Sequence, residues 1–320
     1  MESEKNISGI SDNLSESISE QDNSKVKRNN KTLLAGKKIA ISVSTSGEKE
    51  LERIGLSEHH IKDVSIEIAR YLLVNGASLI YGGDLRIGGY TELFAELSYQ
   101  YKYLSDKESR LINYFPFPSA RKLTIEDKAE LIRKQVEPKV LKVPDHLGNH
   151  DPKKDYAPKN NIEDRYLFAE CLTDMRHQMV KDSYARIVLG GIQKDYIGYY
   201  PGIIEETYYS LQAGQPVFLL GGFGGAAKSI IELISGKEVY QISNEFQYDT
   251  DFLVQFRDFA SPRSKVALDY KVIVDFFKSY SVELISKQNG LTIEENMILF
   301  ESSNIHELVF LIIKGLKNVT

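Results

Sequence analysis

Apolar residues between positions 37 and 118 repeat with two different periods, and each change of period predicts a change between strand and helix. The runs KKIAISVS (37–44) and ASLIYGG (77–83) are short and β-rich, as buried strands are. IKDVSIEIARYLLVNG (61–76) and TELFAELSYQYKYL (91–104) carry apolar residues at helical spacing. RLINYFPFP (110–118) is again a strand, closed by prolines. Strands and helices that alternate in this way predict a parallel sheet covered on both faces.

The pattern is interrupted between residues 116 and 162 and then resumes. In the interruption we expect irregular chain with one helix (124–135) and an exposed loop rich in Pro, Lys and Asn (143–161). The resumed pattern predicts helix, strand, helix, strand and helix, over residues 165–182, 185–191, 201–214, 215–222 and 226–236. Helical segments are also expected at the C-terminal end, over residues 251–260, 271–285 and 292–316.

The first 36 residues differ in composition from the rest. They are rich in Ser, Asn and Glu and poor in large apolar groups, so they cannot bury enough surface to offset the entropy of ordering. We therefore predict a disordered tail over residues 1–36. Residues 37–320 are predicted to form a single α/β, Rossmann-like domain with a mostly parallel sheet.

Charge and composition exclude several classes of protein. The formal net charge is -5 and no segment carries a long Lys/Arg stripe, so a nucleic-acid partner is not expected. No apolar run is long enough to span a membrane, and the first residues do not have the pattern of a signal peptide. The lone cysteine, Cys171, fits a reducing compartment and lies in an apolar helical context that favours packing over catalysis. We expect a cytoplasmic protein.

Four turns between a strand and a helix are rich in glycine or hydroxyl groups. The carboxyl ends of parallel strands meet at one edge of a sheet, where glycines let backbone N–H groups approach a phosphate or a ribose. Several such turns point to a phosphate- or sugar-bearing ligand, although glycines that merely permit tight turns remain an alternative. The candidate ligand-binding residues in these turns are Ser44, Thr45, Ser46, Gly47, Gly82, Gly83, Asp84, Arg86, Gly88, Gly89, Gly190, Gly191, Gly222 and Gly224.

Two common nucleotide motifs are missing. GFGGAAKS resembles a phosphate loop, but Ala227 stands before Lys228 where that motif needs glycine. VIVD (272–275) is better interpreted as part of a helix than as a strand ending in a magnesium-binding Asp. The first turn, SVSTSG, lacks the G-x-G-x-x-G fingerprint of dinucleotide-binding domains.

The order SVSTSG, YGG-x-x-x-GG, MRHQM, LGG and PGIIEE resembles the SLOG superfamily, a Rossmann-like group named for the DNA-processing and Lonely-guy proteins. The resemblance covers about residues 37–235. In Lonely-guy enzymes an Arg and a Glu act on the N-glycosidic bond of a nucleoside monophosphate. The resemblance carries these roles onto Arg176 and Glu206, with Gly202 at the position of the motif's glycine.

The sequence is more similar still to SLOG domains of bacterial conflict systems, in which an insert separates GG from PG-x-x-EE. Here the insert is IQKDYIGYY, and NGLTIEENMILF also resembles that group's C-terminal signature. The resemblance implies an NAD-derived ligand such as an ADP-ribose-type signal, a role in anti-phage defence, homo-oligomers and an effector partner. The chain departs from Lonely-guy enzymes at LGG, which replaces PGG, and at Ile203, which replaces Thr. These changes favour binding over hydrolysis.

The insert and the helix after it supply the remaining candidates. Glu206 is expected to contact ribose or a departing sugar–base bond, and Arg176 either a phosphate or the partner of a surface ion pair. Glu205 is expected to face solvent at the start of its helix, with a ligand contact as the other interpretation. The other ligand-binding candidates are Lys194, Tyr200, Pro201 and Gly202, and Tyr196 and Tyr199 could either stack on a base or pack in the loop.

No cofactor or metal site is predicted. His146 and His150 are four residues apart, but Pro144, Gly148 and Pro152 exclude helical geometry for a shared metal. The first hypothesis is therefore a sensor of a nucleotide or NAD-derived ligand, and the second is an N-glycosidic-bond hydrolase that uses Glu206 and Arg176. A structural subunit that uses its surface for assembly is the third.

Overall fold

The computed structural model describes residues 32–83, 88–101, 109–151 and 153–319. Thr32–Thr320 form one compact unit. Residues 1–31, which make up most of the predicted disordered tail, lie outside the described residues. Residues 32–36, also assigned to that tail, are described: they form a turn in which Leu34 is fully buried and its N–H donates to the Asn75 carbonyl at 2.8 Å.

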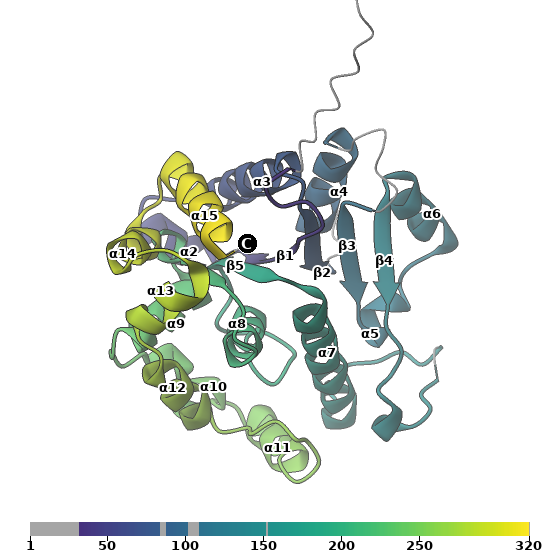
Figure 1. Ribbon diagram of the computed structural model, residues 1–320. Coiled ribbons are helices and arrows are strands. Elements are labelled where there is room, and N and C mark those ends of the chain that lie inside the picture. Colours follow the sequence, from purple (N-terminus) through teal and green to yellow (C-terminus); the bar gives the residue numbers. More distant parts are fainter. Residues whose placement is uncertain (1–31, 84–87, 102–108, 152, 320) are drawn as a thin grey trace, which may run out of the picture. The chain divides into compact units, whose positions relative to one another are not determined.

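Six parallel strands form the central sheet in the order β4-β3-β2-β1-β5-β6 (Figure 1). Most strand residues are buried on both faces, which explains their continuous apolar composition. The strands are β1 Lys38–Ser44, β2 Ser78–Gly82, β3 Leu111–Phe115, β4 Val136–Val140, β5 Ala185–Gly190 and β6 Val217–Leu220.

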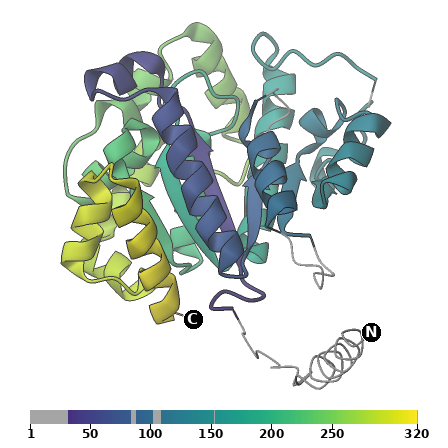
Figure 2. The same cartoon turned by 90° about the horizontal axis from the view of Figure 1, so that it is seen from above.

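One face of the sheet is covered by α3 (Glu58–Val74), α4 (Tyr90–Gln100) and α15 (Ile305–Val319) (Figure 1). Ile39 and Ile41 of β1 belong to the large core cluster that includes this layer. α15 packs beside α3, so the C-terminal helix completes a layer begun by the N-terminal third of the chain (Figure 2, where α15 is yellow).

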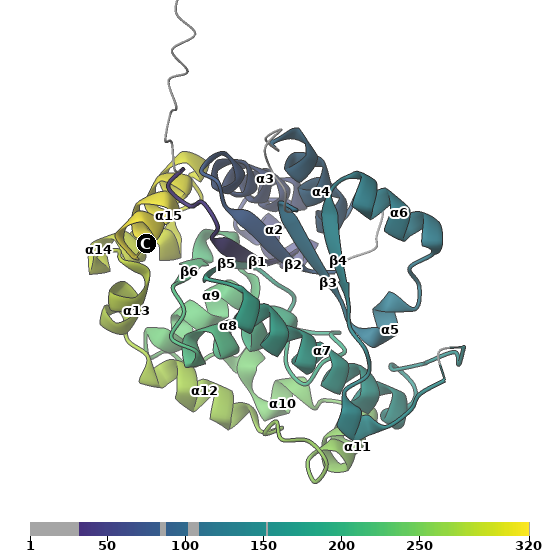
Figure 3. The same ribbon diagram turned by 45° about the vertical axis from the view of Figure 1, so that its right-hand side comes forward.

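The opposite face is covered by α7 (Ile162–Asp182) and α8 (Gly202–Gln212). Here Ala40 of β1 packs in a second cluster with Met175 and Met179 of α7, as the alternation of strand side chains requires. Figure 3 shows α10 (Asn244–Gln247), α11 (Asp251–Ala260) and α12 (Tyr270–Ser279) outside this layer.

The remaining elements join these layers. α13 (Val282–Asn289) and α14 (Ile293–Glu301) pack on β6, and α9 (Gly225–Ile234) packs on β5 and β6. The shorter elements are α2 Glu48–Arg53, α5 Phe117–Ala120, α6 Ile125–Arg133 and the 3₁₀ turns η1 Asp145–Leu147, η2 Gly221–Phe223 and η3 Tyr240–Ile242.

The predicted α/β, Rossmann-like class with a parallel sheet and C-terminal helices is confirmed. The prediction that residues 116–162 hold only one helix is wrong, because β4 and the short α5 also lie there. β4 pairs with β3 although it contains Pro138, which an edge strand tolerates. The helices predicted for 271–285 and 292–316 are each divided in two, and Ser281 caps the second half of the first. Among the described helices, none is both long enough and apolar enough to cross a bilayer.

Candidate functional site

A cavity of about 470 Å³ opens at the carboxyl end of β1. β1 lies between β2 and β5, and the sheet is built outward from it in both directions, to β4 on one side and to β6 on the other. Ligands of open α/β sheets bind at such a switch point. We call this the site cavity. Its lining residues come from β1, β2, α7, α8 and the insert: Ile41, Ser42, Val43, Ser44, Tyr81, Gly82, Gly83, Arg176, Ile192, Asp195, Tyr196, Ile197, Gly202, Ile203 and Glu206.

Glu206 lies in the first turns of α8 and reaches across to β1. Its Oε2 accepts hydrogen bonds from the Ser42 hydroxyl and from Arg186 Nη1, the latter at 2.8 Å. Oε1 has no hydrogen bond to any described residue and lies 3.9 Å from Arg176 Nε. One oxygen is therefore anchored, and the other is available to a ligand.

Arg186 was missed by the sequence analysis although it anchors Glu206. It stands in β5 with no exposed surface, and it donates to Ser42 Oγ at 2.7 Å and to Ser210 Oγ at 2.6 Å. Burial lowers the pKa of its guanidinium, and the charge of Glu206 opposes that shift. The signal was present in the sequence: an Arg inside the apolar run ARIVLG requires a buried anion.

Arg176 is held in the cavity wall by Glu205. Arg176 Nη1 donates to Glu205 Oε2 at 2.5 Å, and the Thr173 hydroxyl donates to Glu205 Oε1. Arg176 Nε is buried and has no hydrogen-bond partner among the described residues. A Cβ at position 202 would lie 3.1 Å from Nη2, so Gly202 leaves room for this guanidinium.

The expectation that Glu205 faces solvent is wrong. Its residue is 0% exposed, and it does not line the site cavity. The physical reason is the neighbouring cation: a buried Arg176 needs a buried carboxylate, and Glu205 points toward α7 rather than toward water. Glu205 therefore positions Arg176 from the side that faces away from the site cavity.

Of the four candidates in the first turn, one lines the site cavity and three stabilise the turn itself. Ser44 lines the site cavity. Ser46 is buried and donates to the Phe223 carbonyl at 2.8 Å, and Thr45 Oγ1 accepts from the Gly47 N–H at 3.2 Å. Gly47 precedes α2 with a φ of 95°. Thr45, Ser46 and Gly47 thus shape the turn and are not among the residues that line the cavity.

The second turn brings Gly82 and Gly83 to the cavity. A Cβ at Gly83 would lie 2.5 Å from the Tyr114 carbonyl oxygen, so only glycine fits there. The candidates Asp84 and Arg86 lie outside the described residues. Gly88 and Gly89 precede α4, where Gly89 is the N-cap and the Gly88 N–H donates to Glu92 at 2.7 Å, and they do not line the cavity.

The glycines of the third and fourth turns pack against protein. Gly190 and Gly191 have φ values of 63° and 105° and lie against Ser44 and Ile203. At the start of α9 the Gly225 N–H donates to Glu50 Oε1 at 2.7 Å, so a carboxylate of this chain occupies the helix N-terminus proposed for a phosphate. Gly222 and Gly224 beside it do not line the site cavity.

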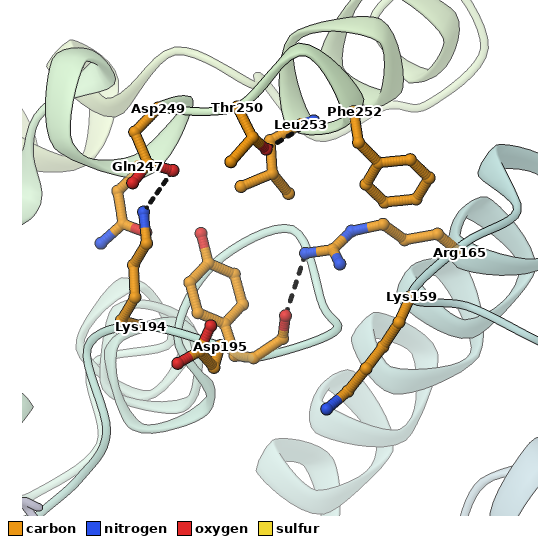
Figure 4. Close-up of a pocket in the computed structure, with 10 residues that line it drawn as sticks. Lys159, Arg165, Lys194, Asp195, Gln247, Asp249, Thr250, Phe252 and Leu253 are labelled. Carbon is orange, nitrogen blue, oxygen red and sulfur yellow. Dashed lines mark hydrogen bonds and ion pairs between the residues drawn. The ribbon is translucent and has the colours of Figure 1, made fainter.

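The insert borders the site cavity through Ile192, Asp195, Tyr196 and Ile197. Lys194 Nζ pairs with Asp249 at 2.7 Å (Figure 4). It also donates to the Phe246 carbonyl at 2.6 Å. Tyr200 is buried, donates to the Ala267 carbonyl and packs edge-on against Tyr270. Of the tyrosines in the insert, Tyr196 is the one that lines the site cavity, and Pro201 is the buried N-cap of α8.

The histidines of the 143–161 segment contact protein groups. His146 Nε2 lies 3.0 Å from Glu170 Oε2, and His150 Nε2 lies 3.2 Å from the Leu147 carbonyl oxygen. Within the described residues, no three His, Cys, Asp or Glu side chains are placed to hold a metal ion. Cys171 is buried in α7.

Two comparisons with known proteins bear on this site. No curated protein matches the chain. A family model described as SLOG cluster2 matches residues 33–299, which includes every strand and every residue that lines the site cavity. The recognition of the SLOG superfamily from the turn motifs is thereby confirmed. The chain belongs to the SLOG cluster2 family.

Proposed function

We propose that this protein binds a nucleotide or NAD-derived ligand, such as an ADP-ribose-type signal, in the site cavity and serves as a sensor in bacterial anti-phage defence. The observation that carries the proposal is the pair of Arg176 and Glu206 in one cavity at the switch point of the sheet. Membership of SLOG cluster2 supports a nucleotide-related role. The cavity volume of about 470 Å³ is that of a small-molecule site.

The chemistry of the lining residues fits a phosphate and a ribose. Arg176 Nε is unpartnered and can donate to a phosphate oxygen. Glu206 Oε1 can accept from ribose hydroxyls while Oε2 stays anchored. Gly82 and Gly83 allow the ligand to approach the backbone closely.

A second candidate function, cleavage of an N-glycosidic bond, is favoured by the spacing of the same two groups. Glu206 Oε1 lies 3.9 Å from Arg176 Nε, so a carboxylate and a cation both border the space where a ribosyl cation and a phosphate would sit. The ion pair with Arg186 holds the Glu206 carboxylate in one orientation. This feature favours the first candidate function, ligand binding without cleavage.

Isothermal titration against AMP, ADP-ribose, cyclic ADP-ribose isomers and NAD tests the proposal, with each mixture then separated by HPLC. We expect saturable binding of at least one ligand, recovered unchanged. Gly202→Ala should weaken binding because its Cβ would crowd Arg176 Nη2 without touching the Glu206–Arg186 pair. Glu301→Gln, at an exposed carboxylate on α14, is the matched control for Glu206→Gln.

Glu206→Gln leaves Arg186 buried without an anion, so its thermal unfolding must be measured beside its binding. If Glu206→Gln does not fold, the effect of Gly202→Ala on ligand binding tests the proposal in its place. The absence of binding to all four ligand types, or binding unchanged in both variants, would overturn the proposal. Release of free base, lost in Glu206→Gln, would establish the hydrolase instead.

The sensor proposal includes a cytoplasmic location, self-association and an effector protein partner. Light scattering on a size-exclusion column, with and without the ligand found by titration, tests self-association. A constant monomer mass in both conditions would contradict it.

A further inference from the structure

A second cavity, of about 460 Å³, lies on the other side of the insert from the site cavity. It is bordered by the start of α7, by the insert and by the start of α11 (Figure 4). Asp195 and Tyr196 line both cavities. We call this second space the Arg165 cavity. Its lining residues are Lys159, Arg165, Lys194, Asp195, Tyr196, Gln247, Asp249, Thr250, Phe252 and Leu253.

Arg165 is a buried cation without a carboxylate partner. The residue is 6% exposed, and no carboxylate of the described chain lies within ion-pair distance of it. Nη2 donates to the Tyr196 carbonyl at 2.9 Å, while Nε is buried and hydrogen-bonds to no residue that the structure describes. Its sequence neighbour Asp164 is committed elsewhere, to Lys154 at 2.7 Å and to the Ala157 N–H at 2.8 Å.

The surroundings of Arg165 compensate its charge only in part. The guanidinium lies 4.9 Å from the ring centroid of Phe256 and 5.9 Å from that of Phe252, which gives weak cation–π attraction. Burial lowers the pKa of the guanidinium, and the groups that oppose this shift are phenols, Tyr196 first among them. Buried charges in proteins are normally paired, so this cation lacks an anion.

The other charged residues around the cavity do not supply the anion that Arg165 lacks. Lys194 and Asp249 neutralise each other, and Lys159 is an exposed cation at the rim. Among the described residues that line the cavity, Asp195 adds an exposed carboxylate that makes no ion pair with another described residue. In Figure 4 the Arg165 side chain extends from α7 toward the centre of the cavity, opposite Lys194 and Asp249.

The start of α11 adds a second favourable feature. Thr250 caps this ten-residue helix by accepting from the Leu253 N–H, and its hydroxyl hydrogen remains able to donate. The helix N-terminus carries partial positive charge toward the cavity that Thr250, Phe252 and Leu253 line.

We propose that the Arg165 cavity binds a phosphate-class anion, with Arg165 as its principal donor and Lys159 and Thr250 beside it. The anion is either free phosphate or the pyrophosphate of a ligand whose ribose end reaches the site cavity, and this second source rests on the proposed function. Arg165 and Arg176 are eleven residues apart on α7, nearly on one helix face and about 16 Å apart along the axis. A ligand that reaches both must be as long as a dinucleotide, so a nucleoside monophosphate would reach one of them only.

Thermal unfolding in inorganic phosphate tests the site on the full chain. Phosphate, up to about 50 mM and compared with chloride at equal ionic strength, should raise the Tm of the wild type. Arg165→Met should lose most of this phosphate-dependent rise, while its Tm without phosphate stays equal or increases because a buried unpaired charge has been removed. Arg133→Met, which removes an exposed arginine of α6, should keep the full rise.

Titrations of AMP and ADP-ribose distinguish the two sources. If the anion is the pyrophosphate of the ligand, Arg165→Met should weaken ADP-ribose about tenfold or more and leave AMP unchanged, as expected for one lost charge-assisted contact. If it is free phosphate, only the Tm effect should depend on Arg165. Lys159→Gln changes an exposed side chain of the same cavity and should reduce the phosphate-dependent rise in Tm or the affinity for ADP-ribose, whichever depends on Arg165. It replaces Arg165→Met in the test if that variant does not fold.

The proposal is overturned if neither the phosphate-dependent Tm nor the affinity for ADP-ribose depends on Arg165, or on Lys159 should Arg165→Met not fold. Failure of every nucleotide to bind would refute the proposed function alone, because the phosphate measurement needs no nucleotide.

Discussion

The negative charge of Glu205 should contribute strongly to the stability of the fold by holding Arg176 in the cavity wall. Glu205→Gln keeps the shape of the side chain but removes the anion next to a guanidinium that is 7% exposed. Breaking a buried ion pair from one side costs about 3–5 kcal/mol. We expect about 3 kcal/mol, the lower end, because Arg176 Nε already lies 3.9 Å from Glu206 Oε1 and can shift toward it.

Urea unfolding followed by circular dichroism measures this cost. A loss of about 3 kcal/mol is large against the roughly 5–15 kcal/mol of a typical domain. Glu67→Gln is the matched control, because its pair with Arg70 on α3 is partly exposed, at 28% and 37% of the two side chains, and should contribute less than about 1 kcal/mol. If Glu205→Gln costs no more than Glu67→Gln, the positioning role of Glu205 is refuted.

A double-mutant cycle then isolates the pair. Arg176→Met alone leaves Glu205 buried without its cation, so it should also destabilise. The double variant Arg176→Met/Glu205→Gln should be destabilised by less than the sum of the two, by about 1–3 kcal/mol. Strict additivity would show that the two side chains do not interact.

Three further predictions concern other parts of the fold. Glu50→Ala should lower the free energy of unfolding by about 1 kcal/mol because it uncaps the Gly225 N–H, whereas Glu48→Ala on the same helix should change it little in the same urea titration. Burial lowers the pKa of His177, so its contribution to stability is full above the unfolded value of 6.5 and is lost as pH falls toward the folded value. Wild type should therefore lose more stability than His177→Gln between about pH 7.5 and about pH 5.5, and equal losses would contradict this. Burial raises the pKa of Cys171 to about 12, so DTNB should react with it only after unfolding, and rapid reaction of the native protein would disprove its burial.

The sequence predicts those elements whose local pattern and tertiary role agree. β1, β2, β3, β5 and β6 are apolar runs because both faces of a parallel sheet are buried. β4 reads VEPKV, with two charges and a proline, and it is a strand only because β3 offers an edge to pair with. The divided C-terminal helices follow the same rule: helical periodicity continues across Tyr280 and Ser302, but caps and packing end the helices there.

The site could be predicted only as far as its motifs reach. The resemblance to SLOG proteins nominates Arg176 and Glu206, and the structure brings both to one cavity with Gly82 and Gly83. The partners of these groups could not be predicted, because Ser42 and Glu206 are 164 residues apart and meet only when the sheet and α8 assemble. For the same reason no local pattern reveals that Glu50 occupies the helix N-terminus at Gly225.

The two outer strands of the sheet limit how copies of this chain can associate. Pro138 removes an N–H from edge strand β4, which is also only five residues long, and such strands resist pairing with another sheet. At the opposite edge α13 and α14 cover β6, and the Asn289 amide donates to the Val217 carbonyl at 3.1 Å. A continuous intermolecular sheet through either of these edges is therefore disfavoured, whereas the outward faces of α14 and α15 offer another surface for association. Phe310 of α15 and Met297 of α14, 65% and 42% exposed, are among the large apolar side chains on these helices that another copy could cover.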